Sequence, residues 1–183
     1  MVLATFYLNS AGLMNLMHLV CHLCVGSLPM EIPADVAVLM IQIGSNDLTN
    51  QRVSVDEFVQ YLTTYMNRLF ADHPNLMDVK VLEILHRQQP RQQPRWSRRR
   101  PMGMSMARYN ERVDEANRRL LHWSRLHGLR GPATFYKHDR EVRSQRLVAA
   151  DGVHFTPFGL QKYWRSVRGA ALRSVRGLRT RHF

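Results

Sequence analysis

A short apolar run over residues 35–43 restricts the architectures that this chain of 183 residues can adopt. The run is rich in β-branched residues and does not alternate between polar and apolar positions. Such a pattern is typical of a strand that is buried on both faces, as in the parallel sheet of an α/β protein. The turn sequence Gly44-Ser45-Asn46-Asp47 follows directly, so these residues are expected at the carboxyl edge of the sheet.

Helical and strand patterns alternate along the chain. Ser54 and Glu57 form a capping box before one helix, and Thr156-Pro157 marks the start of the last one. The patterns predict helices over residues 11–24, 54–70, about 105–127 and from 157 onward, and strands over 35–43, 79–85 and 133–136. This order predicts an α/β fold with a three-layer α/β/α, flavodoxin-like parallel sheet. It forms one domain over residues 1–183, with its core at about 11–178.

The last helix is expected to present an apolar face to this core and a basic face to solvent. Its apolar positions recur at helical spacing. The residues expected to be buried are Leu160, Tyr163, Trp164, Val167, Ala171 and Val175.

The chain carries no charged residue before Glu31. A signal peptide or membrane anchor would fit this stretch, but it lacks a basic start, and Asn15, His18 and His22 interrupt it. We therefore favour a domain helix over residues 11–24, with its apolar positions on one side.

The same stretch contains a Cys-x-x-Cys motif, Cys21 to Cys24, beside His18 and His22. Structural zinc sites usually take two such half-sites, and the sequence contains only one. We expect two reduced core thiols here, and neither a metal nor another cofactor.

The net charge of +12 is distributed unevenly. Residues 1–85 contain 3 Lys/Arg and 8 Asp/Glu, whereas residues 86–183 contain 23 and 6. Residues 86–104 repeat Gln-Gln-Pro-Arg and include Arg98–Arg100 close to Trp96, which predicts a flexible basic loop. A basic half of this kind either contacts nucleic acid or another polyanion, or is a solvated surface.

Two short motifs contain the candidate catalytic residues of the chain. Gly44-x-Asn46-Asp47 ends the first buried strand, and Asp151-x-x-His154 precedes the last helix. An Asp that accepts the N–H of a His is the base half of a hydrolase triad, and an Asn can direct its NH2 group at an oxyanion. Each motif alone could simply form a turn, because Asn, Asp and Gly are common turn residues. Together, in this order, they favour hydrolysis.

On these residues the chain resembles the SGNH (GDSL-type) hydrolases. Gly44–Asp47 matches the third block of that family and Asp151–His154 matches its last block, and the resemblance extends over most of residues 35–178. It implies carboxylic-ester hydrolysis through an acyl-enzyme without a metal. By the same resemblance, His154 is the general base and Asp151 its orienting partner. Asn46 is an oxyanion donor, Gly12 a further oxyanion residue, and Asp47 and Gly44 brace the loop.

The nucleophile block of the family, Gly-Asp-Ser, does not occur in the sequence. Ser10 and Ser27 are the only serines before the Gly44–Asp47 motif, and Ser10 is the candidate because Ser27 lies next to the wrong strand. The first strand and helix of the family also do not fit in the residues before Asn46. We therefore expect a domain that is incomplete at its N-terminal side, with the nucleophile unassigned.

Two functions follow from these patterns. The first is SGNH-type ester hydrolysis, on an unidentified ester and without activity if the nucleophile is missing. The alternative is a catalytically inactive basic module that binds nucleic acid or another polyanion through its Arg-rich segments. No integral membrane partner is expected. Two free thiols favour an intracellular location, and the uncharged start is a lesser sign of secretion, so the compartment is unknown with an intracellular location slightly favoured.

Overall fold

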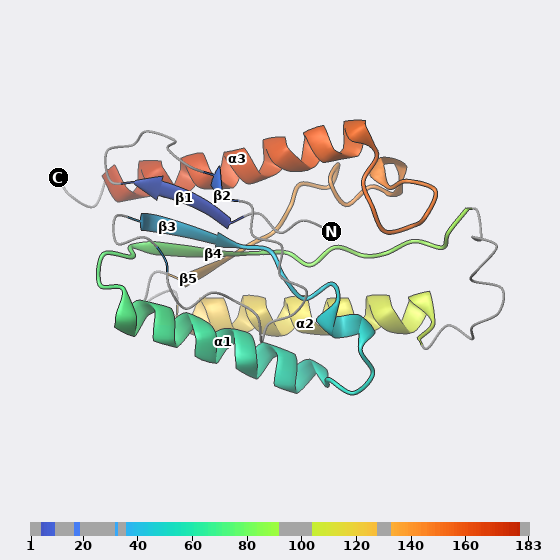
Figure 1. Ribbon diagram of the computed structural model, residues 1–183, viewed down its shortest axis with the longest axis horizontal. Coiled ribbons are helices and arrows are strands. Elements are labelled where there is room, and N and C mark those ends of the chain that lie inside the picture. Colours follow the sequence, from blue (N-terminus) through green and yellow to red (C-terminus); the bar gives the residue numbers. More distant parts are fainter. Residues whose placement is uncertain are drawn as a thin grey trace.

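A computed structural model describes residues 5–9, 17–18, 32, 36–91, 104–127 and 133–179. Within these ranges the chain forms one sheet with helices on both faces (Figure 1). The elements are β1 (Thr5–Asn9), β2 (Met17–His18), β3 (Val36–Ile41), α1 (Val55–Asp72), β4 (Asp78–Leu82), α2 (Met106–His127), β5 (Ala133–Tyr136) and α3 (Pro157–Arg179), with short 3-10 turns at Asp47–Thr49 and Gln145–Leu147.

The sheet has the strand order β2-β1-β3-β4-β5. Strands β3, β4 and β5 are parallel, as the sequence predicts, with Leu39 opposite Val79 and Val79 opposite Ala133. All six residues of β3 are buried, because helices cover both faces of the sheet at this strand. The carboxyl ends of the three parallel strands therefore share one edge, where ligands bind in sheets of this kind.

The helices form two outer layers (Figure 1). Helices α1 and α2 lie on one face of the sheet, and α3 lies on the other. The capping box that begins α1 is present, with the Ser54 hydroxyl accepting from the Glu57 amide and the Glu57 carboxylate accepting from the Ser54 amide. The three-layer α/β/α fold is thus confirmed.

The apolar stripes of the helices account for this packing. In α1, every buried position falls at helical spacing, and the same holds for α2. On α3, Tyr163 and Val167 are buried as expected, but the prediction for Leu160 is wrong, since 44% of it is exposed. Leu160 lies in the first turn of α3, and the expected stripe begins instead at Gly159, which packs against the Leu147 carbonyl.

The N-terminal helix predicted over residues 11–24 is wrong at Met17–His18, which form strand β2. Strand β1, which the sequence patterns did not indicate, pairs antiparallel with both β2 and β3. Strand β1 forms backbone hydrogen bonds with β3, whose edge would otherwise be open. The spacing of apolar side chains gives no information on this backbone pairing. The sheet is therefore mixed rather than purely parallel. The other residues of this predicted helix lie outside the described ranges.

The sequence predicts a flexible loop from residue 86 onward, whereas residues 86–91 are held by hydrogen bonds to other parts of the chain. Residues 86–91 follow β4 in an extended path, and Arg87, Gln88 and Arg91 all donate backbone hydrogen bonds. The partners lie in α2 and in the loop before α3, so local composition could not reveal them. Residues 92–103, with Trp96 and Arg98–Arg100, lie outside the described residues. None of the described helices is long and apolar enough to cross a membrane.

Candidate functional site

The Gly44–Asp47 motif follows β3 at the carboxyl edge of the sheet. Gly44 has a φ of 102°, and a Cβ atom there would come within 2.6 Å of the Phe58 ring and 2.7 Å of Ile84. Only glycine combines this backbone conformation with this close approach. The Gly44 carbonyl accepts from the Leu48 amide at 2.9 Å, and Asp47 is buried as the first residue of the 3-10 turn. The chain thus turns sharply and places Asn46 at the tip.

Arg87 holds this tip in place. Its Nη2 atom donates to the Ser45 carbonyl and the Ser45 hydroxyl, both at 3.0 Å, and to Asn46 Oδ1 at 3.3 Å. The guanidinium also lies 4.7 Å from the ring centroid of Tyr109, whose hydroxyl is 3.2 Å from Ser45 Oγ. A guanidinium can only donate hydrogen bonds, so the oxygen of the Asn46 amide faces Arg87. The NH2 group of Asn46 therefore remains available as a donor.

Asp151 and His154 form a hydrogen-bonded pair. Asp151 Oδ2 lies 2.5 Å from His154 Nδ1, and Asp151 Oδ1 accepts from the backbone amides of Val153 and His154, each at 2.9 Å. These hydrogen bonds, first that of the His154 ring, lower the pKa of Asp151 to about 2. The carboxylate is therefore ionised at neutral pH and holds the proton of His154 on Nδ1, which leaves Nε2 as the basic nitrogen.

The loop that carries this pair is docked onto the segment that follows β4. The Gly152 carbonyl accepts from the Gln88 amide and the Ala150 carbonyl accepts from the Arg91 amide, both at 2.8 Å. Gly152 has a φ of 76°, and a Cβ atom there would lie 2.1 Å from the Gln88 carbonyl oxygen. The position thus requires glycine for both its conformation and its contact.

Consecutive residues of one segment therefore anchor both motifs. Arg87 binds Ser45 and Asn46, and Gln88 binds Gly152 between Asp151 and His154. Helix α2 fixes the segment in turn, because the side chain of Asn110 bonds the Arg87 amide and carbonyl, each at 3.0 Å. Motifs that are more than 100 residues apart in the sequence thus meet at Arg87-Gln88.

The dyad is open to solvent on its outer side. The side chain of His154 is 57% exposed and that of Asp151 is 45% exposed. In the part of the chain that the structure describes, His154 Nε2 has no hydrogen-bond partner. This nitrogen is the atom that would take a proton from a nucleophile in a triad.

The predictions for Ser10, Gly12 and Ser27 stay predictions, because these residues lie outside the described ranges. Asn9, which precedes Ser10, pairs with Val36 at the amino end of β3. Asn46 follows the carboxyl end of the same strand, and a strand of this length spans roughly 20 Å. The end of β1 at Asn9 and the turn at Asn46 therefore lie at opposite edges of the sheet.

Sequence reasoning missed the residues that join the two motifs. Arg87 belongs to a stretch that composition assigned to a flexible loop, and Tyr109 and Asn110 belong to the helix predicted over about 105–127, where neither was assigned a role at the site. The only local signal was a Tyr-Asn pair at the start of that helix. In the described residues no group of three His, Cys, Asp or Glu side chains could hold a metal ion, and Cys21, His22 and Cys24 lie outside them.

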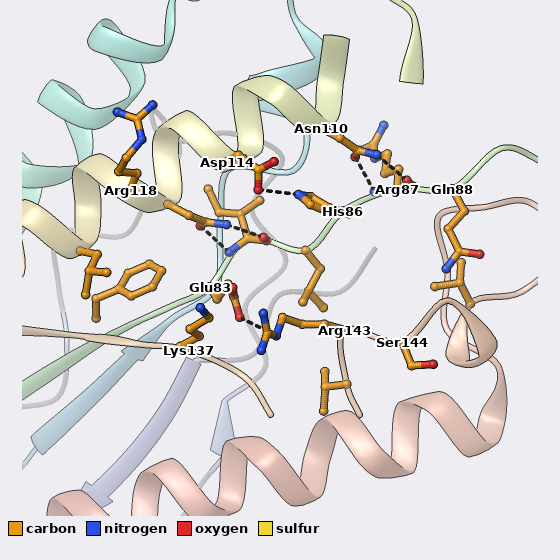
Figure 2. A pocket seen from close by; sticks show the side chains of 17 residues that line it. Glu83, His86, Arg87, Gln88, Asn110, Asp114, Arg118, Lys137, Arg143 and Ser144 are labelled. Atoms are coloured by element: carbon orange, nitrogen blue, oxygen red, sulfur yellow. Dashed lines mark hydrogen bonds and ion pairs between the residues drawn. The ribbon is translucent and has the colours of Figure 1, made fainter. Parts of the chain in front are cut away.

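A cavity of about 540 Å³ borders this site (Figure 2). It lies beyond the carboxyl ends of β4 and β5, between α2 and the loop that follows β5, and Arg87 and Gln88 contribute to its lining. Asn46, Asp151 and His154 do not line it.

Comparison with known proteins identifies the fold. No family model matches the chain, and no curated protein matches it in sequence. Among solved structures, an acetyl esterase variant with a bound acetate ion and a carbohydrate esterase of family 3 from Talaromyces cellulolyticus each superpose with a TM-score of 0.58 at 16% identity, over 78% of this chain. The chain spans 60% of the length of each of these proteins. The chain therefore has the α/β fold of an esterase, and the likeness by itself shows the fold alone.

Proposed function

We propose that this domain is a carboxylic-ester hydrolase of the SGNH type. His154 is the general base, Asp151 orients it, and the NH2 group of Asn46 binds the oxyanion. The observation that carries the proposal is the joint anchoring of both motifs: Arg87 contacts Asn46 at 3.3 Å, and Gln88 contacts Gly152 at 2.8 Å. The esterase fold of the solved structures supports it as well.

The proposed mechanism is acyl transfer through a serine. His154 Nε2 takes the proton of the serine hydroxyl as its oxygen attacks the ester carbonyl, and Asp151 stabilises the imidazolium that forms. The tetrahedral oxyanion accepts from Asn46, and such a donor lowers the barrier by about 3–4 kcal/mol in enzymes where it was removed. His154 then protonates the leaving alcohol, and water releases the acid from the acyl-enzyme by the same steps in reverse order.

A fluorophosphonate probe tests the proposal and identifies the serine. The proposal requires a stoichiometric adduct on one serine of the full-length chain, which mass spectrometry would map and so identify the nucleophile. His154→Ala should reduce ester turnover by about 10⁶-fold and largely abolish labelling, because the residues of a triad act as a unit. Asp151→Asn, which keeps the size of the side chain, should reduce turnover by about 10⁴-fold because the ring loses its tautomer.

The matched control is His122→Ala, which removes an exposed histidine of α2. It should label like the wild type. A folded chain that forms no adduct, or one that labels equally with and without His154, would contradict the hydrolase proposal. The basic binding module would then be the function to test, by the salt dependence of its affinity for nucleic acid.

Arg87→Gln should lower kcat by about 10- to 100-fold with little change in KM. The substitution removes the contacts that hold Ser45 and Asn46, so the oxyanion donor loses part of its fixed orientation, and full removal of such a donor costs about 10²- to 10³-fold. Steady-state kinetics on a neutral ester measures both constants. Arg108→Gln, at an exposed arginine of α2 that pairs with Glu111, is the control and should keep wild-type values. An unchanged kcat in Arg87→Gln would show that Arg87 does not position Asn46.

A further inference from the structure

The cavity beside the proposed site has a basic wall (Figure 2). Its floor is the segment over residues 83–88, one wall is α2, and the other wall is the loop that follows β5. Lys137 and Arg143 lie on the loop wall, and Arg118 lies on the helix wall. A volume of about 540 Å³ is in the range of pockets that hold small organic ligands.

The acidic side chains of the cavity are already engaged. Glu83 Oε2 accepts from the His138 amide at 2.9 Å and lies 3.8 Å from Arg143 Nε. Burial raises the pKa of Glu83, while the His138 amide and the charges of Arg143 and Lys137 act in the opposite direction. Asp114 is bonded to His86 Nε2 at 2.8 Å. Among the lining residues, the basic side chains of Arg87, Arg118, Lys137 and Arg143 outnumber the acidic ones of Glu83 and Asp114, so the cavity carries an excess of positive charge.

The basic groups remain accessible to a ligand. Lys137 is exposed, and 40% of the Arg143 side chain is exposed. The Arg118 side chain is 69% exposed but forms an ion pair with Glu115, so Lys137 and Arg143 are the groups that a ligand would meet first. Between them the wall is apolar, with Leu121 from α2 and Phe135 from β5. This combination suits a ligand with a short carbon chain that ends in a carboxylate, because the chain is buried and the anion meets Lys137 and Arg143.

The cavity and the proposed site share part of their walls. Arg87 and Gln88 line the cavity and also anchor the loops of Asn46 and His154. Val148 lines the cavity too, and the next residue, Ala149, donates its amide to the His154 carbonyl at 2.7 Å. A ligand in the cavity thus lies beside the backbone that carries the dyad.

We propose that this cavity binds a carboxylate of the ester substrate, so that the domain acts on esters that carry a negative charge, such as half-esters of dicarboxylic acids. The inference rests on the proposed function for the ester, but the carboxylate site itself can be tested by binding alone. Lys137 and Arg143 are the binding groups.

The first experiment measures binding of succinate to the full-length chain by NMR titration. We expect saturable shifts of the residues around the cavity, about 10-fold weaker binding in Lys137→Glu, and loss of binding in Leu121→Trp, which fills the cavity without changing its charge. Arg68→Glu reverses the charge of an exposed arginine of α1 and is the control, because it changes the net charge by the same two units as Lys137→Glu. Equal affinities in wild type, Lys137→Glu and Arg68→Glu would overturn the inference. So would equal weakening in both variants, because net charge alone would then explain the binding.

The second experiment compares two para-nitrophenyl esters of equal chain length, the hemisuccinate and the neutral butanoate. Lys137→Glu should raise KM for the hemisuccinate by about 10-fold and leave KM for the butanoate unchanged. Succinate binding without turnover of either ester would overturn the proposed function and leave the carboxylate site standing. Turnover of both esters, with equal KM values in wild type and Lys137→Glu, would overturn the carboxylate site and leave the hydrolase standing.

Discussion

Gly152→Ala is expected to detach the loop of the Asp151–His154 pair and to remove ester turnover almost as completely as loss of His154 does. A methyl group at this position would lie 2.1 Å from the Gln88 carbonyl oxygen, and backbone cannot move aside as a flexible side chain can. The φ of 76° adds strain of about 1–2 kcal/mol for a residue with a Cβ atom. The loop must move, and the hydrogen bonds from Gln88 and Arg91 then break.

The free energy of unfolding should fall by about 2–4 kcal/mol, as it does when strain and lost hydrogen bonds combine at one position. Urea denaturation measures this loss, and amide exchange at Gln88 and Arg91 reports the detachment directly. The control is Gly169→Ala in α3, where a new Cβ atom would meet nothing within 4 Å. That variant should gain about 0.5–1 kcal/mol, since alanine favours a helix interior over glycine. Similar stabilities for the two variants would show that the loop is not held at Gly152.

The protein is also expected to lose stability in mild acid because of His138. This residue is 2% exposed, its Nδ1 atom lies 3.1 Å from Ser166 Oγ, and its ring packs between Tyr136 and Tyr163. Burial, with a smaller contribution from the charge of Arg143, lowers the pKa of His138 from 6.5 to about 4. The folded protein therefore keeps His138 neutral at pH values where the unfolded chain binds a proton.

The sign of the effect follows from this difference in proton binding. The contribution of neutral His138 to the free energy of unfolding is complete above pH 6.5. It is lost as the pH falls from 6.5 to about 4, where the folded form also binds the proton. One pKa unit corresponds to about 1.4 kcal/mol, so the loss over this window is about 3 kcal/mol. Protonation of Glu83, whose pKa is raised by burial, acts in the opposite direction at its own pKa.

Urea denaturation between pH 4.5 and 7.5 measures this slope. In His138→Gln the free energy of unfolding should be lower at pH 7.5 than in wild type but should depend much less on pH, because the buried titrating group is gone. Glu83 is present in both proteins, so its contribution largely cancels in the comparison. His122→Gln, at an exposed histidine of α2, should keep the wild-type slope. Equal slopes in wild type and His138→Gln would exclude His138 as the cause.

Much of the fold could be predicted from local patterns. The stripe on α1 is an example: Phe58, Leu62, Tyr65, Met66 and Leu69 are all buried, as helical spacing requires. Strand β5 begins and ends at the predicted residues, and α2 differs from its predicted start by one residue. Strand β1 could not be predicted in this way, because its place depends on the open edge of β3, which lies almost thirty residues away in the sequence.

The candidate site, like the fold, could be predicted from the sequence only in part. The motifs of Asn46 and of Asp151–His154 were visible as residue types at short spacing, and the hydrogen bond within the Asp-His pair spans only three residues. Composition assigned Arg87 to a flexible loop, although tertiary contacts hold it in an ordered segment. The cavity could not be predicted for a related reason, since its walls come from the segment after β4, from α2 and from the loop after β5.

The sequence by itself therefore determined which segments are strands and helices in the α/β core, and which residue types could form a hydrolase dyad. Those features depend on residues within one or two turns of each other, where spacing maps directly onto geometry. Only the tertiary structure decided that β1 runs antiparallel, that Arg87-Gln88 joins the two motifs, and that Lys137 and Arg143 face a common cavity. Each of these depends on contacts between groups far apart in the chain, and such contacts form only when the packing of the whole domain brings the groups together.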